Sequence, residues 1–488
     1  MKICLERIKA AAMAIVMTGM LMPFASSCAE KVVWSEDPAE RLSFSTDTVS
    51  FDTVFTALGS SAAVFRIYNN NRNALRSDVF LAGDAGSPFR INIDGQSGHA
   101  VSDVDIRGGD SLYCFVSVFV NPLDSDSPLL VEDSIRFVLE NGAVQYVRLM
   151  AYGQDVTVLK GEVVRDGSTK TLTASRPYLI RDSLYVEPGS ELVIEKGARL
   201  YFHDDASLIV GGRISAAGTP DSMIVMCGDR LDNMLSGIPY DLVTGRWGGV
   251  FIRNTSFGNE LLSCDIHSGN CGIVVDSSNV EQCKLLLDGC IVHNVKYDAL
   301  SLNSCRSIVR NSRISNAGAH CVDILGGDHR FDFCTIAGFY PWSVKESALY
   351  LCNKSDTTMY PIIRAEFVNC IITGYGSDEV MGFIVDSIPG VSPDLISNYR
   401  IEHSLVLTAD TTDAHLVCDV WDTDSNPVHA AANFRHASQG DFRFDFRLDS
   451  LSRARGMASP STLCPLDING VPRPDSLADV GCYQYVPY

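Results

Sequence analysis

The sequence predicts an all-β fold in which most of the chain winds into a solenoid of short parallel strands. Between residues 183 and 226, three- or four-residue strands of alternating apolar residues repeatedly end at glycine, as Leu192-Val193-Ile194 does before Gly197. Further along, Cys or Ser stands two positions before an aliphatic residue in six segments. Their first residues are separated by 26, 22, 22, 36 and 34 positions: Cys264, Cys290, Ser312, Cys334, Cys370 and Ser404.

Strands this short cannot form a sandwich alone, but they can form the faces of a coil. Each turn of such a coil rises by one strand spacing, roughly 4.8 Å. The first three intervals correspond to about one coil each, and the two longer intervals fit one coil with an inserted loop. Ser268, Asn294 and Asn316 stand two positions after the aliphatic residue, where each coil must turn and the left-handed conformation is needed.

Residues two apart on a strand face the same side, so the repeats predict two inward columns. One column contains Cys264, Cys290, Cys334 and Cys370, and the other contains Ile266, Val292, Ile314 and Ile336. Free Cys behaves as a small apolar core residue, and a parallel stack suits disulfide geometry poorly. We therefore interpret most of these cysteines as reduced core residues, with a metal or redox role as the alternative.

The 16 cysteines form no CxxC pair and no Cys/His cluster with zinc-ligand spacing. The sequence accordingly predicts no metal and no cofactor. It leaves the disulfide status of six cysteines open: Cys114, Cys227, Cys352, Cys418, Cys464 and Cys482.

Residues 41–155 predict a separate β-sandwich. Phe89-Arg90-Ile91-Asn92-Ile93 alternates apolar and polar residues, and Asn141-Gly142 predicts the turn of a hairpin. About seven short strands with regular turns fit such a sandwich. The segments Ser50–Phe55, Phe65–Asn69 and Ala151–Gly153 resemble the Hydin-type immunoglobulin-like domains of bacterial surface proteins. That resemblance implies an immunoglobulin-like spacer or docking module.

The segment Arg246–Ile252, which follows the glycine-closed strands, resembles bacterial right-handed parallel β-helix proteins. The resemblance covers more than half of the chain and implies a pectin lyase-like fold. Because this fold includes pectate lyases, polygalacturonases, tailspikes and adhesins, it does not by itself select a function. Asp467–Pro474 and Asp479–Tyr483 are similar to C-terminal segments of such proteins, and we expect them to pack over the last coil.

The N-terminus predicts export and membrane anchoring. Three basic residues precede the apolar stretch Ala10–Phe24, and small residues lead to Cys28, as in the lipobox of bacterial lipoproteins. The resemblance implies acylation of Cys28 and an outer membrane location, on either the periplasmic or the surface-exposed side. An ordinary signal peptide with an incidental Cys28 is the alternative. The predicted organisation is a signal peptide (1–27), a lipidated tether (28–40), the immunoglobulin-like sandwich (41–155), the β-helix (156–440) and a capping segment (441–488).

The formal net charge of −20 argues against nucleic acid and against polyanionic glycan as a generic partner. Lys2, Arg7 and Lys9 against Glu6 give the signal peptide a net charge of +2, so the rest of the chain is near −22. A local basic groove remains compatible with this balance.

The rung alignment places four polar residues together on an outward face: Asp265, His267, His293 and Arg313. Acid, imidazole and guanidinium groups could support proton abstraction or glycosidic cleavage. The alternative is an ordinary solvated face. Three aromatic residues in and after the inserted loop are candidates for stacking on sugars, with loop packing as their alternative: Tyr340, Trp342 and Tyr350.

Three functions follow from this pattern. The first is an envelope lipoprotein that binds a glycan or a protein partner along the β-helix without catalysis. The second is a polysaccharide lyase or glycoside hydrolase with a groove around the four polar residues. The third is a structural spacer or adhesin. The closely paired Asp residues and the Gly-His-Gly segment of polygalacturonase-like enzymes are absent, and this disfavours the enzyme.

Overall fold

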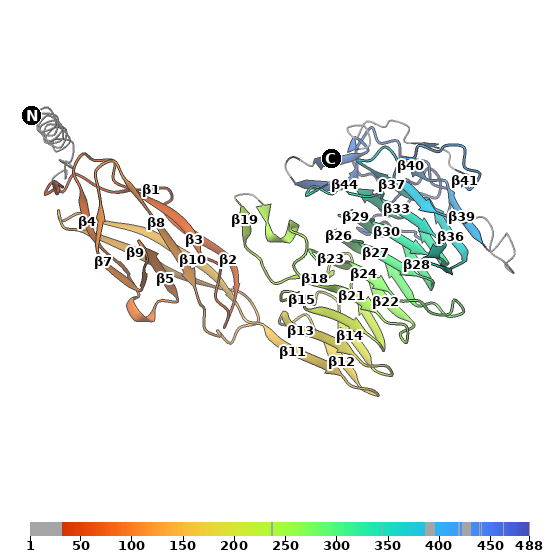
Figure 1. The fold of residues 1–488 in the computed structure, drawn as a ribbon, viewed down its shortest axis with the longest axis horizontal. Helices are drawn as coiled ribbons and strands as arrows, with labels where there is room; N and C mark the ends of the chain where they lie inside the picture. The colour runs from red at the N-terminus through yellow and green to blue at the C-terminus, as the bar shows by residue number, and fades with distance from the viewer. Residues whose placement is uncertain are drawn as a thin grey trace, which may run out of the picture. The chain divides into compact units, whose positions relative to one another are not determined.

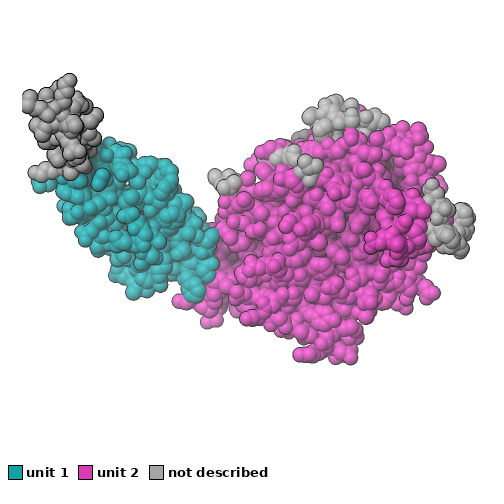
Figure 2. Space-filling model, viewed as in Figure 1, with its two compact units in different colours: residues 1–51, 59–119, 130–151 teal, residues 52–58, 120–129, 152–488 magenta. Residues whose placement is uncertain are grey.

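The computed structural model describes residues 32–487 apart from positions 236–237, 344, 386–395, 418–419, 422–430, 439, 441 and 462. The chain forms two compact units (Figure 2). The first comprises Met1–Phe51, Gly59–Phe119 and Leu130–Ala151, and the second comprises Asp52–Leu58, Val120–Leu129 and Tyr152–Tyr488. Within the described ranges, no helix is long and apolar enough to cross a membrane. The predicted signal peptide and Cys28 lie outside the described residues.

The N-terminal part is built from two five-stranded sheets, in the orders β1-β3-β8-β5-β6 and β2-β10-β9-β4-β7. Phe44 on β1 lies 4.8 Å from Phe137 on β9, measured between ring centroids, so the sheets pack face to face. The predicted hairpin turn at Asn141-Gly142 joins β9 and β10. The strands are β1 (Ser43–Phe44), β2 (Thr48–Phe55), β3 (Ala63–Tyr68), β4 (Leu75–Leu81), β5 (Phe89–Ile93), β6 (Gln96–Gly98), β7 (Ala100–Ile106), β8 (Ser111–Val118), β9 (Leu129–Leu139) and β10 (Val144–Gln154).

The rest of the chain is a right-handed parallel β-helix whose coils contribute strands to three stacks (Figure 1). It begins with β11 (Thr157–Val164) and the long strand β13 (Tyr178–Val186), which pairs with both β15 and β16. The first stack contains β12 (Thr169–Leu172), β14 (Glu191–Glu195), β17 (Arg213–Ala217), β22 (Asn259–Leu262), β25 (Leu285–Asp288), β28 (Arg306–Arg310), β31 (Gly327–Asp332), β36 (Ile362–Val368), β39 (Ser397–Glu402) and β41 (Leu416–Val417).

The second and third stacks share one continuous sheet. The second contains β15 (Arg199–Phe202), β18 (Ile224–Gly228), β23 (Cys264–His267), β26 (Ile291–Val295), β29 (Arg313–Ala317), β32 (Thr335–Gly338), β37 (Ile371–Gly374), β40 (Leu405–Val406) and β42 (Val420–Trp421). The third contains β16 (Ser207–Val210), β21 (Gly249–Ile252), β24 (Ile273–Val275), β27 (Leu300–Asn303), β30 (Val322–Leu325), β33 (Leu349–Cys352) and β38 (Val380–Phe383).

The predicted rung alignment is confirmed by the register of the second stack. Ile266 pairs with Val292, Val292 with Ile314, and Ile314 with Ile336, and all four side chains are fully buried. The expected turn residues adopt the left-handed conformation, with φ of 61° at Ser268, 50° at Asn294 and 55° at Asn316. The 36-residue interval is a coil enlarged by a loop after β32 and by the hairpin of β34 (Lys354–Ser355) and β35 (Thr358–Met359).

The predicted cysteine column is fully buried at Cys264, Cys290, Cys334 and Cys370. All cysteines of the described ranges have free thiols, including Cys114, Cys227, Cys352, Cys464 and Cys482, whereas Cys418 lies outside those ranges. Ser312 occupies the same column and accepts a hydrogen bond from the Cys290 N–H at 3.1 Å. Cys and Ser thus share one buried column of small residues.

Two parts of the chain cover the outward side of the second stack. One is residues 238–247, which we call the covering segment; it contains β20 (Ile238–Pro239) and the 3-10 helix η3 (Tyr240–Leu242). The other is the C-terminal segment, residues 442–461 and 463–487, which begins with β44 (Arg443–Leu448) paired to β43 (Phe434–Ser438). Apolar residues of this segment pack with the outward side chains Ala337, Ile371 and Leu405.

The position of the C-terminal segment corrects an expectation. The sequence predicts that it packs over the last coil, but its described contacts lie along the side of the second stack. The Gly481 N–H bonds the Asn369 carbonyl, and the Cys482 N–H bonds the Thr335 hydroxyl at 3.0 Å. Outward residues of several second-stack strands are apolar, so they are buried against the C-terminal segment and not exposed to water.

Candidate functional site

The structure brings together three of the four polar residues that the rung alignment selects. Asp265 and His267 lie on β23, and His293 lies opposite His267 on β26. The Asp265 carboxylate contacts His267 Nδ1 and His293 Nε2, each at 3.0 Å. The two imidazole rings are 4.9 Å apart. One carboxylate therefore links two histidines of neighbouring coils.

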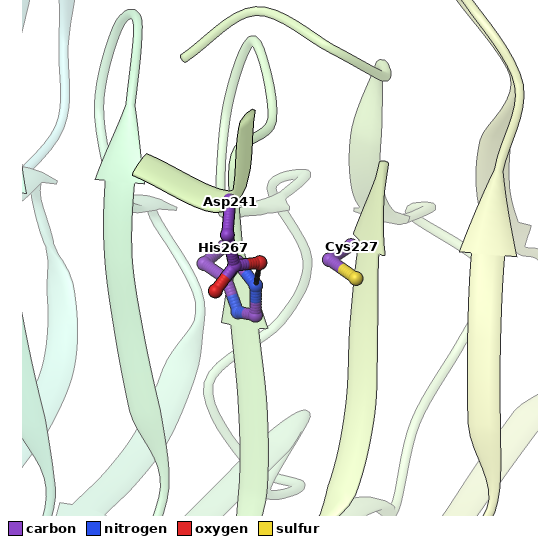
Figure 3. Close-up of side chains that lie close together, drawn as sticks. All are labelled: Cys227, Asp241 and His267. Atoms are coloured by element: carbon purple, nitrogen blue, oxygen red, sulfur yellow. Dashed lines mark hydrogen bonds and ion pairs between the residues drawn. The ribbon is translucent and has the colours of Figure 1, made fainter. Parts of the chain in front are cut away.

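Two residues that were not predicted complete this group (Figure 3). Asp241, on η3, contacts His267 Nε2 through its carboxylate. Cys227, at the end of β18, follows the pairs Val225–Asp265 and Met226–Ile266, so it stands next to His267 in register. We call Cys227, Asp241, Asp265, His267 and His293 the histidine cluster.

The outward direction of this column was predicted, but its burial was not. His267 is only 4% exposed. Side-chain hydrogen bonds help to attach the covering segment: the Trp247 indole donates to the His267 carbonyl at 2.7 Å, the Trp342 indole donates to the Leu242 carbonyl at 3.0 Å, and the Tyr340 and Thr244 hydroxyls lie 3.0 Å apart. The expectation of a solvated face is therefore wrong at His267.

Burial and charge act differently on the two histidines. Burial alone would lower the pKa of His267, but Asp265, Cys227 and Asp241 raise that pKa well above its ordinary value. At His293 burial prevails and lowers the pKa. Burial likewise opposes ionisation of Asp265, yet the two imidazoles bring its pKa well below the usual range. The carboxylates of Asp265 and Asp241 thus favour the charged form of the His267 imidazole.

Arg313 is separated from this cluster. It lies in the outward column of Asp265, two coils further on, through the pairs Asp265–Ile291 and Ile291–Arg313. Its guanidinium lies over the Phe446 ring at 5.4 Å and donates to the Tyr483 hydroxyl at 3.3 Å. The C-terminal segment, and not the histidine cluster, therefore surrounds Arg313.

A cavity of about 720 Å³ opens beside Arg313, between the second stack and the C-terminal segment. We call it the arginine pocket, because three guanidiniums line it: those of Arg313, Arg435 and Arg447. Arg447 pairs with Asp445 at 2.5 Å. The remaining polar lining comes from Asp467, Asn469, Tyr483 and Gln484. Asp265, His267 and His293 do not belong to its lining.

The three predicted aromatic residues have different surroundings. Tyr340 is buried and Trp342 is half-buried, and both bond the covering segment. Tyr350 projects outward from β33, where its ring stacks on the His320 imidazole at 4.7 Å. Asp323 is its partner in the preceding coil, and burial, with a smaller contribution from Asp298, raises the pKa of Asp323 to about 6.

Two overlapping sets of side chains could hold a metal ion. One is Cys227, Asp241 and His267, and the other is Asp265, His267 and His293; within each set the ligand atoms lie within 4.8 Å of one another. The sequence predicted no metal because these residues have no recognisable spacing. Extending the rung alignment back by one coil would have placed Cys227 beside His267. Asp241 lies in an insertion that has no repeat to align.

Comparison with known proteins agrees with the observed coils. Residues 248–380 match the family described as "Right handed beta helix region". These residues form a right-handed β-helix. The chain is also 32% identical over 120 residues to Protein bark beetle of Drosophila melanogaster, a match that covers 20% of this chain and 4% of that protein. The chain thus spans a small fraction of that relative.

Solved structures resemble the chain only weakly. The catalytic unit of a thermostable GH87 alpha-1,3-glucanase from Streptomyces thermodiastaticus strain HF3-3 aligns with 75% of this chain and 77% of its own, at 10% identity and a TM-score of 0.27. The periplasmic chaperone SfaE aligns with 23% of this chain and 57% of its own, at 10% identity and a TM-score of 0.17. Similarity this low supports no argument about function.

Proposed function

We propose that the protein is an envelope lipoprotein that binds an acidic glycan in the arginine pocket without catalysing a reaction on it. The supporting observation is the cavity of about 720 Å³ with three guanidiniums in its wall. This volume is within the usual range of small-ligand sites, roughly 300–1,000 Å³.

The chemistry of the lining favours a sugar that bears a carboxylate. Guanidinium groups recognise carboxylates through paired, charge-assisted hydrogen bonds. Asn469 supplies an amide group suited to hydroxyls, and the Tyr483 ring gives the wall an apolar surface. Because the whole chain is strongly acidic, an anionic glycan would be attracted only where basic residues gather.

The separation of the histidine cluster from this pocket supports binding without catalysis. A general acid or base must be within hydrogen-bond reach of the reacting group or act through one water molecule. Asp265 and His293 are not part of the pocket lining, and the covering segment buries His267. Lyase or hydrolase activity is the alternative, and incubating the purified chain with a panel of acidic and neutral glycans, with detection of unsaturated uronates and new reducing ends, tests it.

Binding of oligogalacturonate to the purified full chain, measured by calorimetry beside a neutral oligosaccharide, tests the proposal. We expect Arg447→Gln and Arg435→Gln to weaken binding of the acidic oligosaccharide about tenfold or more, because each charged hydrogen bond contributes about 1.5–3 kcal/mol. The control is Arg310→Gln on the first stack, where Arg310 pairs with Asp288. That variant should bind like the unaltered protein.

Two results would contradict this proposal. One is the absence of binding to every acidic and neutral glycan of the panel. The other is formation of unsaturated uronates or new reducing ends that His293→Ala abolishes, since that result would establish an enzyme. Binding only to a surface protein would move the proposal to a protein partner.

The membrane anchor is a separate part of the proposal. Cys28 follows small residues at the end of an apolar stretch, as expected for an acylated N-terminus. Labelling with radioactive palmitate in the bacterial host should mark the protein, and Cys28→Ser should abolish the label and release the chain from the membrane fraction. A labelled Cys28→Ser variant would contradict the assignment.

A further inference from the structure

We propose that Cys227, Asp241 and His267 bind a divalent transition metal ion, with zinc as the best match. The three side chains come from β18, the covering segment and β23, so the fold brings them together from separate segments (Figure 3). Their ligand atoms lie within 4.8 Å of one another. Tetrahedral zinc with these ligands would need separations of roughly 3.3–3.8 Å, as its bond lengths require. The Asp241 side chain is 53% exposed, so it has room to move from its contact with His267 Nε2 to this separation.

The ligand types select the metal. A thiolate sulfur, an imidazole nitrogen and a carboxylate oxygen are the donors that zinc and similar borderline ions accept together. Calcium and magnesium prefer oxygen alone, so a set containing Cys227 Sγ and a His267 nitrogen disfavours both. Cys227 is only 3% exposed and lies beside polar groups of the cluster, unlike the cysteines of the inward column.

The surroundings of His267 match those of a metal ligand. Its Nε2 faces Asp241, while its Nδ1 lies 3.0 Å from the Asp265 carboxylate. Metal-binding histidines commonly donate their second ring N–H to a carboxylate, which sets the orientation of the ring. Asp265 is held in turn by His293 Nε2 at 3.0 Å. We therefore assign Asp265 and His293 as positioning residues.

This network also decides between the two possible ligand sets. If Asp265, His267 and His293 bound the ion, the Asp265 oxygen that accepts both imidazole contacts would have to release them. With Cys227, Asp241 and His267 as ligands, both contacts persist. Binding releases the protons of the Cys227 thiol and of His267 Nε2 to solvent.

Metal binding would have a structural consequence. Asp241 belongs to the covering segment, so the ion would join this segment to the β-helix. Three protein ligands leave one position of a tetrahedral zinc ion open, and the exposed side of Asp241 gives water access to it. The inference does not depend on glycan binding, because none of the three ligands lines the arginine pocket.

Cobalt titration of the purified full chain, after treatment with EDTA, tests the site directly. We expect one cobalt ion per chain, displaced by zinc, with a near-ultraviolet absorption band from a thiolate ligand. Cys227→Ser should abolish this band, whereas the control Cys271→Ser should retain it. Asp241→Asn should weaken zinc binding measured by calorimetry, while Asp232→Asn, at a residue that precedes η3 and pairs with Arg230, should not. Asp265→Asn should weaken it about 10–100-fold, as for other residues that orient metal ligands.

A measurement on the unaltered protein tests the site even if a variant fails to fold. One equivalent of zinc should protect the Cys227 thiol from alkylation, read by mass spectrometry, and should leave Cys271 unprotected. Equal protection of both thiols, no stoichiometric binding, or a cobalt spectrum without the thiolate band would each overturn the proposal. Loss of binding in His293→Ala with full binding in Cys227→Ser would assign the ion to the other ligand set and overturn it as well.

Discussion

The first and second stacks of the β-helix both carry charged residues on their outward sides, but on the second stack a further segment of the chain lies over them, and its Asp241 contacts His267. On the first stack, charges of neighbouring coils alternate in sign: Asp288 pairs with Arg310 at 2.8 Å, and Asp328 pairs with Arg364 at 2.6 Å. On the second stack, His267 is 4% exposed beneath the covering segment, while Asp265 and His293 beside it are half-buried.

The difference shows that the cover, more than the residue types, decides what a polar column can do. The repeat geometry is the same on both faces, with one residue of each coil stacked on the next. On an open face, water screens each charge pair, and residues of opposite charge on neighbouring coils compensate one another. Under a cover, charge interactions are stronger and unpaired groups are costly, so enclosed groups acquire shifted pKa values.

The largest expected effect comes from breaking one charge pair on each face. Asp265→Ala leaves the buried imidazole of His267 without the carboxylate that contacts its Nδ1, and we expect the free energy of unfolding to fall by about 3–5 kcal/mol. Asp288→Ala removes an exposed pair on the first stack and should cost about 0–1 kcal/mol. Urea denaturation of both variants in EDTA measures the two losses. Equal losses would remove the distinction between the faces.

A second prediction uses pH to compare the stacks. His329 on β31 is buried, and burial lowers its pKa to about 4. The folded chain therefore protonates His329 less readily than the unfolded chain does. The contribution of neutral His329 to the free energy of unfolding is fully present above pH 6.5 and is lost as the pH decreases toward 4. The loss corresponds to about 3 kcal/mol. His329→Gln should remove this part of the pH dependence in urea unfolding, and an unchanged slope would refute the assignment.

The histidine of the second stack should act with the opposite sign. The pKa of His267 is raised, so its contribution to stability is present below pH 6.5 and is lost as the pH rises through the raised pKa. His267→Gln, measured by urea unfolding in EDTA, should therefore lower the free energy of unfolding more at pH 6 than at high pH. The opposite pH dependences of His329→Gln and His267→Gln distinguish a neutral histidine inside the first stack from a histidine paired with carboxylates on the second stack.

The smallest expected effect concerns the attachment of the cover. Trp342→Phe removes the hydrogen bond to the Leu242 carbonyl, and we expect a loss of about 0.5–1.5 kcal/mol. Hydrogen exchange should accelerate in residues 238–247. Tyr350→Phe on the third stack is the control and should leave exchange in that segment unchanged. Unchanged exchange in Trp342→Phe would show that other contacts hold the cover.

The coils could be predicted because their pattern is local and repeats. A small residue, an aliphatic residue and a turn residue recur in each coil, so aligning Ile266 with Val292 was sufficient to place Asp265, His267 and His293 together. The same alignment placed Arg313 in the column of Asp265. It could not show that the C-terminal segment surrounds Arg313, because that contact joins residues 170 positions apart.

The limits of pattern reasoning are clearest at Gly326–His329, which resemble a turn in the sequence. Gly326 does turn, with φ of 63°, but β31 begins at Gly327 and His329 lies buried on it. His329 is kept in the core because Ser307 bonds its Nδ1 and the Gly326 carbonyl bonds its Nε2, both at 2.8 Å. A buried polar group needs such partners, and here Ser307 supplies one from the neighbouring coil while Gly326 supplies the other from the same coil.

The order of amino acids alone specifies the solenoid, its register and its core of small and aliphatic residues, because each coil repeats the same burial pattern. The folded chain alone decides which outward residues are enclosed. Asp241 reaches His267 from an insertion without a repeat, and Trp247, Tyr340 and Trp342 hold that insertion in place. Such contacts join distant segments through individual side chains, so no local periodicity in the sequence predicts them.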